Sequence, residues 1–223
     1  MKIAIDGPSG SGKSVLAKGI AKKYNIVYVD TGALYRAVGL FVMRRGIDKF
    51  DSAAVVAALA DIVISLEYSA DEGQKVVLCG ENVNDYIRTP EVSLYASAVS
   101  AIPQVREFLL STQRDIIAAN SVVMDGRDIG TVIMPNADVK FFLTADVNER
   151  ARRRHAELVV RGLDDTYEQV LADMQTRDHN DSTRENAPAV AADDAVLLDN
   201  TGYECEQTLE TAVKIIESRI GLR

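Results

Sequence analysis

The chain has 223 residues, 47% of them hydrophobic and 26% charged, which is typical of a globular protein that buries a sizeable core. Its formal net charge of −8 argues against a dedicated nucleic-acid-binding protein, which would carry an excess of Lys and Arg. The longest apolar stretch, Ala53 to Leu66, is too short to span a bilayer, and no secretory hydrophobic region follows Met1, so we expect a cytoplasmic protein that binds neither membranes nor nucleic acid.

Short apolar runs typical of strands alternate along the chain with longer segments of helical period. The expected strands are Lys2–Ile5, Ile26–Val29, Val122–Met124, Val139–Leu143 and Ala195–Leu198. The expected helices are Ser14–Tyr24, Ala33–Arg45, Pro103–Ala119, Glu149–Val160, one capped by Asp165 or Thr166, and about Glu206–Ile220. This alternation predicts an α/β fold with a five-stranded parallel sheet flanked by helices.

One segment breaks this alternation. Ile62–Glu67, Lys75–Leu78 and Glu81–Val83 have the pattern of short strands, and turn-forming residues lie between them at 69–73 and at Gly80. We therefore expect a small antiparallel insertion at about 61–90 within a single domain of residues 1–223, whose core comprises residues 1–60 and 91–223.

The strongest motif is Gly7-Pro8-Ser9-Gly10-Ser11-Gly12-Lys13-Ser14, which matches the P-loop pattern G-x-x-x-x-G-K-[ST]. It lies between an expected strand and an expected helix, where backbone N–H groups and the helix dipole would bind phosphate oxygens. We predict that Gly7 to Val15 bind ATP, that Lys13 bridges the β- and γ-phosphates, and that the Ser14 hydroxyl ligates Mg²⁺. The motif indicates a nucleoside triphosphate site but does not identify the reaction.

The rest of the sequence narrows the P-loop classes. A GTPase would carry an [NT]-K-x-D motif, which this sequence lacks, and a nucleic-acid motor would be longer and more basic. The small size and a second set of anion-binding residues favour a small-molecule kinase. Two alternatives stay open: a kinase for another monophosphate, a sugar or an acid, and a non-catalytic module that changes shape when it binds ATP.

Several longer segments resemble bacterial-type cytidylate kinases. They are residues 26–36 (IVYVDTGALYR), 87–92 (IRTPEV), 105–107 (VRE), 123–132 (VMDGRDIGTV), Arg177-Asp178 and 181–185 (DSTRE). The resemblance covers nearly the whole chain in order. It implies a P-loop kinase with a short lid that transfers a phosphoryl group from ATP to CMP or dCMP with Mg²⁺, in pyrimidine nucleotide metabolism. We expect the enzyme to be a monomer.

The resemblance also implies roles for individual residues. Those expected to bind CMP are Thr31, Arg36, Ser97, Arg106, Arg127, Asp128, Arg177, Asp181 and Arg184. Among them Ser97, Arg106 and Asp128 would hydrogen-bond cytosine, while Arg36 and Arg127 would bind the acceptor phosphate. Asp125, at the end of an apolar strand, would hold the hydrated Mg²⁺ through water together with Ser14. The expected catalytic residues are Lys13, Arg127, Arg177 and Arg184.

These residue types suit phosphoryl transfer between nucleotides. The reaction gathers negative charge, and arginine binds phosphate with two parallel hydrogen bonds while staying charged. The acceptor oxygen is already anionic, so no strong general base is required. We also expect Arg177, Asp181 and Arg184 to share one face if a helix continues through all three.

A dense run of arginines, residues 150 and 152–154, has two interpretations. Arg152 fits a solvated helix face. Arg150, Arg153 and Arg154 fit either such a face, with Arg153 paired to Glu157, or a lid of about residues 150–162 in which Arg153 and Arg154 bind ATP.

Three positions depart from the family pattern. Ala189 and Asn200 stand where Leu and Thr are expected, and we expect both positions to pack rather than take part in the reaction. His155 stands where an aromatic residue is common, which weakens the expectation that it contacts ATP.

Overall fold

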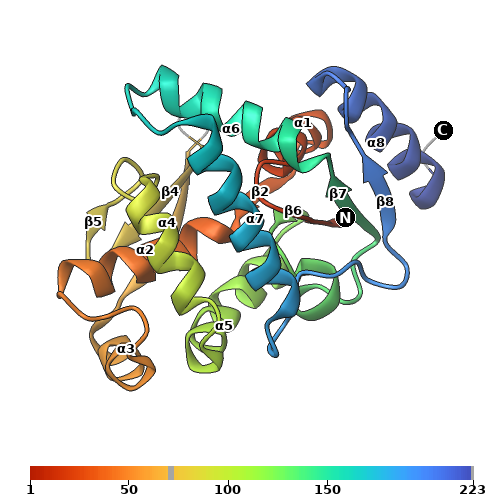
Figure 1. The fold of residues 1–223 in the computed structure, drawn as a ribbon. Helices are drawn as coiled ribbons and strands as arrows, with labels where there is room; N and C mark the ends of the chain where they lie inside the picture. Colours follow the sequence, from red (N-terminus) through yellow and green to blue (C-terminus); the bar gives the residue numbers. More distant parts are fainter. Residues whose placement is uncertain (70–72, 222–223) are drawn as a thin grey trace. The chain divides into compact units, whose positions relative to one another are not determined.

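The computed structural model describes residues 1–69 and 73–221. The chain forms two compact units, one of Met1–Tyr28 with Asn120–Arg223 and one of Val29–Ala119 (Figure 1). The predicted turn at 69–73 lies in part outside the described residues, because residues 70–72 are not among them. None of the helices formed by the described residues is long and apolar enough to cross a membrane.

The five-stranded parallel sheet is confirmed and has the strand order β2-β6-β1-β7-β8. Its strands are β1 (Lys2–Asp6), β2 (Val27–Asp30), β6 (Val122–Asp125), β7 (Val139–Thr144) and β8 (Val196–Asp199). Each strand ends one residue later than predicted. The extra residue is a polar one that still belongs to the strand, so a row of Asp and Thr side chains marks the carboxyl ends of the sheet.

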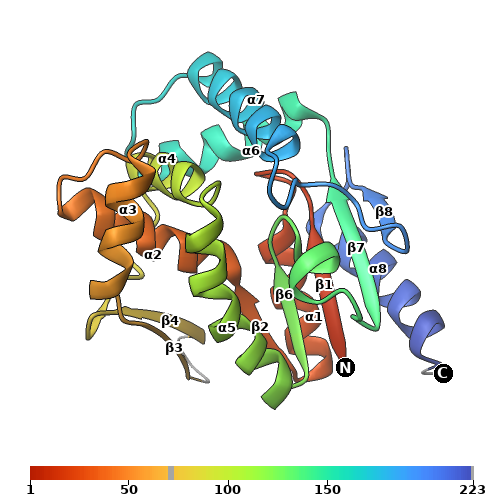
Figure 2. The same cartoon turned by 90° about the horizontal axis from the view of Figure 1, so that it is seen from below.

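Helices of the first unit cover one face of this sheet and its carboxyl ends. They are α1 (Lys13–Tyr24), α6 (Val147–Val160), α7 (Tyr167–Thr183) and α8 (Cys205–Ile220), with a π-helical turn η2 (Ile129–Ile133) after β6. Helices α1 and α8 pack side by side, and their buried Leu16 and Ile216 join Ile3 and Phe141 in one core. Figure 2 shows α6 and α7 beyond the carboxyl ends of β1 and β7.

The caps of α6 and α7 explain where the two helices begin. Asp146 accepts hydrogen bonds from the backbone N–H groups of Asn148 and Glu149 at the start of α6. Thr166 and Gln169 form a reciprocal capping box at the start of α7, so the predicted cap is Thr166.

The second unit is built around α2. Its elements are α2 (Thr31–Arg44), α3 (Ser52–Ala58), η1 (Leu59–Asp61), β3 (Ile64–Ser69), β4 (Gly73–Leu78), β5 (Glu81–Asn82), α4 (Pro90–Val99) and α5 (Pro103–Ala119). The predicted antiparallel insertion is confirmed as the three-stranded sheet β3-β4-β5. The sequence analysis did not predict α3 and α4. Both carry local start signals, since Asp51 caps α3 and Thr89 caps α4 with Pro90 in its first turn.

The close packing of α2 on α4 leads to a first prediction. A Cβ atom added to Gly39 of α2 would lie 2.8 Å from the backbone nitrogen of Ala96 and 3.1 Å from Cβ of Tyr95. We expect Gly39→Ala to lower the free energy of unfolding by about 1–3 kcal/mol, because the backbone of α4 cannot give way. This loss would appear although alanine is otherwise preferred to glycine inside a helix.

Gly19 of α1 is the matched control. A Cβ atom there would meet Cδ2 of Leu209 at 2.9 Å, and the end of a leucine side chain can move aside. Gly19→Ala should therefore change the free energy of unfolding by less than about 1 kcal/mol. Urea denaturation of both variants measures the difference, and equal stability of Gly39→Ala and wild type would contradict the close approach of α2 and α4.

Candidate active site

The P-loop follows β1 and leads into α1, as the sequence predicts. Gly7 has φ 142°, and a Cβ atom there would lie only 2.0 Å from the backbone oxygen of Leu143 in β7. Gly12 has φ 89° in the left-handed region and forms the N-cap of α1. A side chain at either position would strain the loop, so both glycines of the motif are required by the backbone path.

Lys13 lies inside the loop. The residue is only 6% exposed. The Nζ atom donates to the backbone oxygen of Pro8 at 2.6 Å, and the Ser11 hydroxyl donates to the same oxygen at 3.0 Å. Burial lowers the pKa of Lys13 well below its usual value, and the positive charge of Arg127 lowers it further.

Two further side chains bind carbonyl groups of the loop from outside it. Arg150 of α6 donates from Nη1 to the backbone oxygen of Ser9 at 3.0 Å, and Asn200, directly after β8, donates from Nδ2 to that of Ser11 at 3.0 Å. Arg150 is 5% exposed and also forms a 2.7 Å ion pair with Asp178 of α7. Arg150 is thus a buried link between the loop and the two helices, not part of a solvated face.

Ser14, Asp125 and Tyr28 form a hydroxyl–carboxylate group next to the loop. The Ser14 hydroxyl donates to Oδ2 of Asp125 at 3.0 Å, and the Tyr28 hydroxyl donates to Oδ1 at 2.8 Å. Hydroxyl and carboxylate oxygens are the hard ligands that Mg²⁺ prefers, so this pair fits the predicted ion. Nowhere in the described chain do three or more His, Cys, Asp or Glu side chains gather in a metal-binding group. Water and phosphate would therefore have to supply the other ligands.

A cluster of arginines and aspartates joins the end of β6 to α7. Oδ2 of Asp181 accepts from Nε of Arg127 at 2.8 Å and lies 3.9 Å from Nε of Arg177, while Nη2 of Arg184 lies 3.9 Å from Oδ1 of Asp128. Burial alone would raise the pKa of Asp181, but the charges of the three arginines outweigh it and hold the pKa below its usual value. The structure thus brings these five predicted residues together.

The helical face predicted for this cluster is only partly correct. Helix α7 ends at Thr183, and Arg184 has extended backbone angles, so Arg184 does not continue the face of Arg177 and Asp181. The extended residue turns its guanidinium toward Asp128 instead, and its Nε donates to the backbone oxygen of Ala187 at 2.7 Å.

Asp6 is a buried residue of the site that the sequence analysis did not single out. Its two carboxylate oxygens accept from the backbone N–H groups of Ile129 and Gly130, both at 2.7 Å. These bonds fix the turn η2 that directly follows Arg127 and Asp128. Burial raises the pKa of Asp6 to about 6, although both hydrogen bonds favour the charged form. Its position directly before the P-loop was the available signal.

In the second unit, Asp30 organises the start of α2. Its Oδ1 accepts from the backbone N–H of Ala33 at 3.0 Å, and its Oδ2 lies 3.0 Å from Nη2 of Arg88 and 4.0 Å from Nη1 of Arg36. Thr31, the first residue of α2, is buried. The predicted residues Thr31 and Arg36 therefore lie at one helix end, joined by Arg88, which the sequence analysis did not assign.

Ser97 and Arg106, predicted to bind cytosine, come from α4 and α5. Arg106 donates from Nη1 to the backbone oxygen of Ser100 at 3.2 Å, and its guanidinium lies 5.5 Å from the centre of the Tyr35 ring. The Ser100 hydroxyl in turn donates to the backbone oxygen of Ser97 at 2.8 Å. Ser100 thus links the two predicted residues.

The remaining arginines of α6 differ in their surroundings. Arg153 pairs with Glu149 and donates to Asn200, so the expected pair with Glu157 is wrong. Arg154 forms that pair with Glu157 instead, at 3.0 Å. Arg152 is exposed, in agreement with a solvated position. The lid of about residues 150–162 and the binding of ATP by Arg153 and Arg154 stay predictions.

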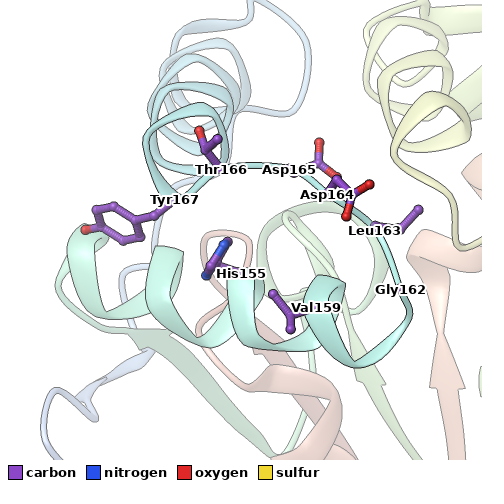
Figure 3. Close-up of a pocket in the computed structure, with 8 residues that line it drawn as sticks. All are labelled: His155, Val159, Gly162, Leu163, Asp164, Asp165, Thr166 and Tyr167. Atoms are coloured by element: carbon purple, nitrogen blue, oxygen red, sulfur yellow. The ribbon is translucent and has the colours of Figure 1, made fainter.

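The connection from α6 to α7 borders a hollow of about 440 Å³ (Figure 3). His155 and Tyr167 line it, with ring centres 6.4 Å apart and ring planes at 89°, an edge-to-face arrangement. Val159 and Leu163 add apolar surface, and Asp164 adds a carboxylate. His155 thus contributes to the packing of the α6–α7 pair.

Comparison with known proteins identifies what the chain resembles. The family model described as Cytidylate kinase matches residues 3–218. A protein named Cytidylate kinase from Carboxydothermus hydrogenoformans is 47% identical over 216 residues, which are 97% of each chain. Proteins of the same name from Caldicellulosiruptor bescii and Lactiplantibacillus plantarum are 46% and 43% identical. The alignments cover 96% and 98% of this chain and 95% and 96% of theirs.

The buried carboxyl group of Asp6 leads to a second prediction. Its pKa is about 6 in the folded protein and 3.8 ordinarily, so between these values the folded chain binds a proton that the unfolded chain has lost. Stability contributed by this group is therefore lost as the pH rises from about 4 to 6. Relative to Asp6→Asn, wild type should lose on the order of 2–3 kcal/mol of unfolding free energy between about pH 4 and 7.

Urea denaturation of wild type and Asp6→Asn across this pH range measures the difference. Titrating groups distant from residue 6 contribute equally to both proteins and cancel when one curve is subtracted from the other. Parallel curves for the two proteins would contradict the raised pKa of Asp6.

Proposed function

We propose that this chain, which belongs to the cytidylate kinase family and is therefore a nucleoside monophosphate kinase, phosphorylates CMP and dCMP with ATP. The match of the family over residues 3–218, with the P-loop included, carries the proposal. Membership of an enzyme family argues against the alternative of a non-catalytic module. The cytoplasmic location, the monomeric state and the role in pyrimidine nucleotide metabolism stay predictions.

The P-loop would bind the phosphates of ATP. Lys13 is already buried in the loop beside other positive charges, and anionic phosphates would favour its charged form again. Ser14 and Asp125 would hold the Mg²⁺ that accompanies ATP, since their oxygens lie 3.0 Å apart and suit a hydrated ion. When bound, the ion neutralises charge on the phosphates.

Phosphoryl transfer would need positioning and positive charge more than acid–base chemistry. An oxygen of the CMP phosphate forms a bond to the γ-phosphorus while the bond to the bridging oxygen breaks, and ADP leaves. Arg127, Arg177 and Arg184 would stabilise the charge on the transferred group. Asp181 and Asp128 support this role, because they hold the guanidinium groups in place before substrate binds.

Residues of the second unit would bind the rest of CMP. By resemblance to the family, Thr31 and Arg36 bind at the acceptor, with Arg36 on its phosphate, and Ser97 and Arg106 hydrogen-bond cytosine. The contact of Arg36 with Asp30 supports its role, since the carboxylate orients the guanidinium at the start of α2.

A substrate panel tests the proposed function. Protein, ATP and Mg²⁺ are mixed with CMP, dCMP, UMP, AMP, GMP or TMP, and the formation of ADP is followed. We expect CMP and dCMP to give the highest kcat/KM, and another best substrate would contradict the proposal. Lys13→Ala is the control, and it should lose at least about 100-fold in turnover because the loop then lacks its cation.

Recognition of the base leads to a separate prediction. Cytosine presents an acceptor at N3 and a donor amino group at C4, whereas uracil presents a donor and an acceptor there. If Arg106 donates to N3 and Asp128 accepts from the amino group, both contacts fail with UMP. Buried polar groups left without partners can discriminate by roughly 10⁴-fold. CMP should therefore exceed UMP in kcat/KM by a wide margin.

Asp128→Ala should narrow this margin by damaging CMP more than UMP. The substitution also removes the contact with Arg184, but that loss affects both substrates and cancels in the ratio. Ser97→Ala should act in the same direction more weakly, since one neutral hydrogen bond contributes only about 1 kcal/mol. A CMP-to-UMP ratio near one, or one that Asp128→Ala leaves unchanged, would contradict this account of base recognition.

A further inference from the structure

Asn200 connects the P-loop to helix α6. Its side chain is buried, with 5% exposure for the residue, directly after β8. The amide Nδ2 donates to the backbone oxygen of Ser11 at 3.0 Å. Oδ1 and the backbone oxygen of the same residue accept from the guanidinium of Arg153, at 3.4 and 3.2 Å. One residue thus binds the loop on one side and an arginine of α6 on the other.

The chemistry of the side chain is specific to an amide. The carbonyl of Ser11 needs a donor, and the guanidinium of Arg153 needs an acceptor. Asparagine supplies both at once from two atoms held in one plane. A carboxylate of the same shape would supply no donor, and a threonine, the residue expected here from the family pattern, has one hydroxyl for both tasks. Asn200 therefore does more than fill space, because it binds both the loop and Arg153.

Backbone hydrogen bonds hold the segment around Asn200 in place. Its N–H donates to the backbone oxygen of Thr144 at the end of β7, at 2.9 Å. Two residues further on, the N–H of Gly202 donates to Glu149 at 2.9 Å, and Glu149 is also the carboxylate paired with Arg153. Residues 200–202 and α6 therefore form one connected network that ends at the P-loop.

We propose that Asn200 is a positioning residue of the donor site, which couples the conformation of the P-loop to the orientation of Arg153. The proposal rests on the proposed function, in which the P-loop binds ATP. It adds a residue outside the motif on which binding of the ATP phosphates depends. If the amide is lost, the Ser11 carbonyl and Arg153 both lose a hydrogen-bond partner. ATP should then bind more weakly, while the affinity for CMP should change much less.

Asn200→Asp and Asn200→Ala test the link. Aspartate keeps the size of the side chain and the acceptor for Arg153. Its second carboxylate oxygen, however, would face the carbonyl oxygen of Ser11, and neither of these two atoms is a donor. We expect KM for ATP, and Kd for ATP measured by calorimetry without CMP, to rise about tenfold. KM for CMP should change by less than about twofold. If one of these two variants does not fold, the other carries the same comparison.

Asn84→Asp is the matched control. Asn84 makes the same two kinds of bond in the antiparallel sheet, donating to the backbone oxygen of Gln74 and accepting from the N–H of Val76, both at 2.9 Å. This variant should lose thermal stability while KM for ATP stays at the wild-type value. An effect of Asn200→Asp on stability alone, as in the control, would overturn the proposal.

A double-mutant cycle tests the coupling itself. Asn200 and Arg153 are proposed to act as one network with the loop. The double variant Asn200→Ala/Arg153→Ala should therefore lose less free energy of ATP binding than the sum of the losses in the two single variants. Additive effects would overturn the proposed coupling. Wild type that does not bind ATP would instead contradict the proposed function, and the inference with it.

Discussion

The conformation of the P-loop depends on hydrogen bonds made by its carbonyl groups. A loop whose N–H groups serve a phosphate must find other partners for its carbonyls, because buried backbone groups need a partner. Lys13 binds the carbonyl of Pro8, Arg150 that of Ser9 and Asn200 that of Ser11. Two of these three donors come from α6 and from the segment after β8. The conformation of the P-loop is therefore set in part by residues more than a hundred positions away from the motif.

A chain with a net charge of −8 nevertheless concentrates positive charge beside this loop. Each of these arginines faces a carboxylate. Asp181 accepts from Arg127 and lies close to Arg177. Asp128 lies close to Arg184. In the proposed reaction such pairing would orient each guanidinium before substrate arrives, so that little reorganisation would be needed. The lowered pKa of Lys13 shows the cost of gathering cations in a buried place, a cost that bound phosphates would offset.

Asp6 and Asp30 occupy equivalent places at the ends of β1 and β2. Asp6 binds the two N–H groups of the turn after β6, and Asp30 caps α2 while it contacts Arg36 and Arg88. In each case a carboxylate at the end of a strand fixes the backbone or the side chains of a neighbouring segment. The carboxyl edge of a parallel sheet is where ligands bind in folds of this kind. Here the same edge also carries the carboxylates that hold the turn η2 and the start of α2 in place.

Much of this protein follows from local sequence patterns. The strands, six of the helices, the P-loop and the antiparallel insertion are all visible in the sequence, because hydrophobic period, glycine spacing and turn residues are properties of neighbouring residues. Helices α3 and α4 were not predicted although Asp51 and Thr89 cap them, since a short helix beside an apolar stretch lacks a clear period.

Contacts between distant segments could not be derived in this way. Nothing near Lys13 in the sequence indicates that it is buried, and nothing near Asn200 indicates a bond to Ser11. The bond from Arg153 to the backbone oxygen of Asn200 likewise depends on where the segment after β8 lies against α6. Hydrogen bonds and ion pairs of this kind join residues that only the packing of helices on the sheet brings within about 3 Å, a distance that no local pattern encodes.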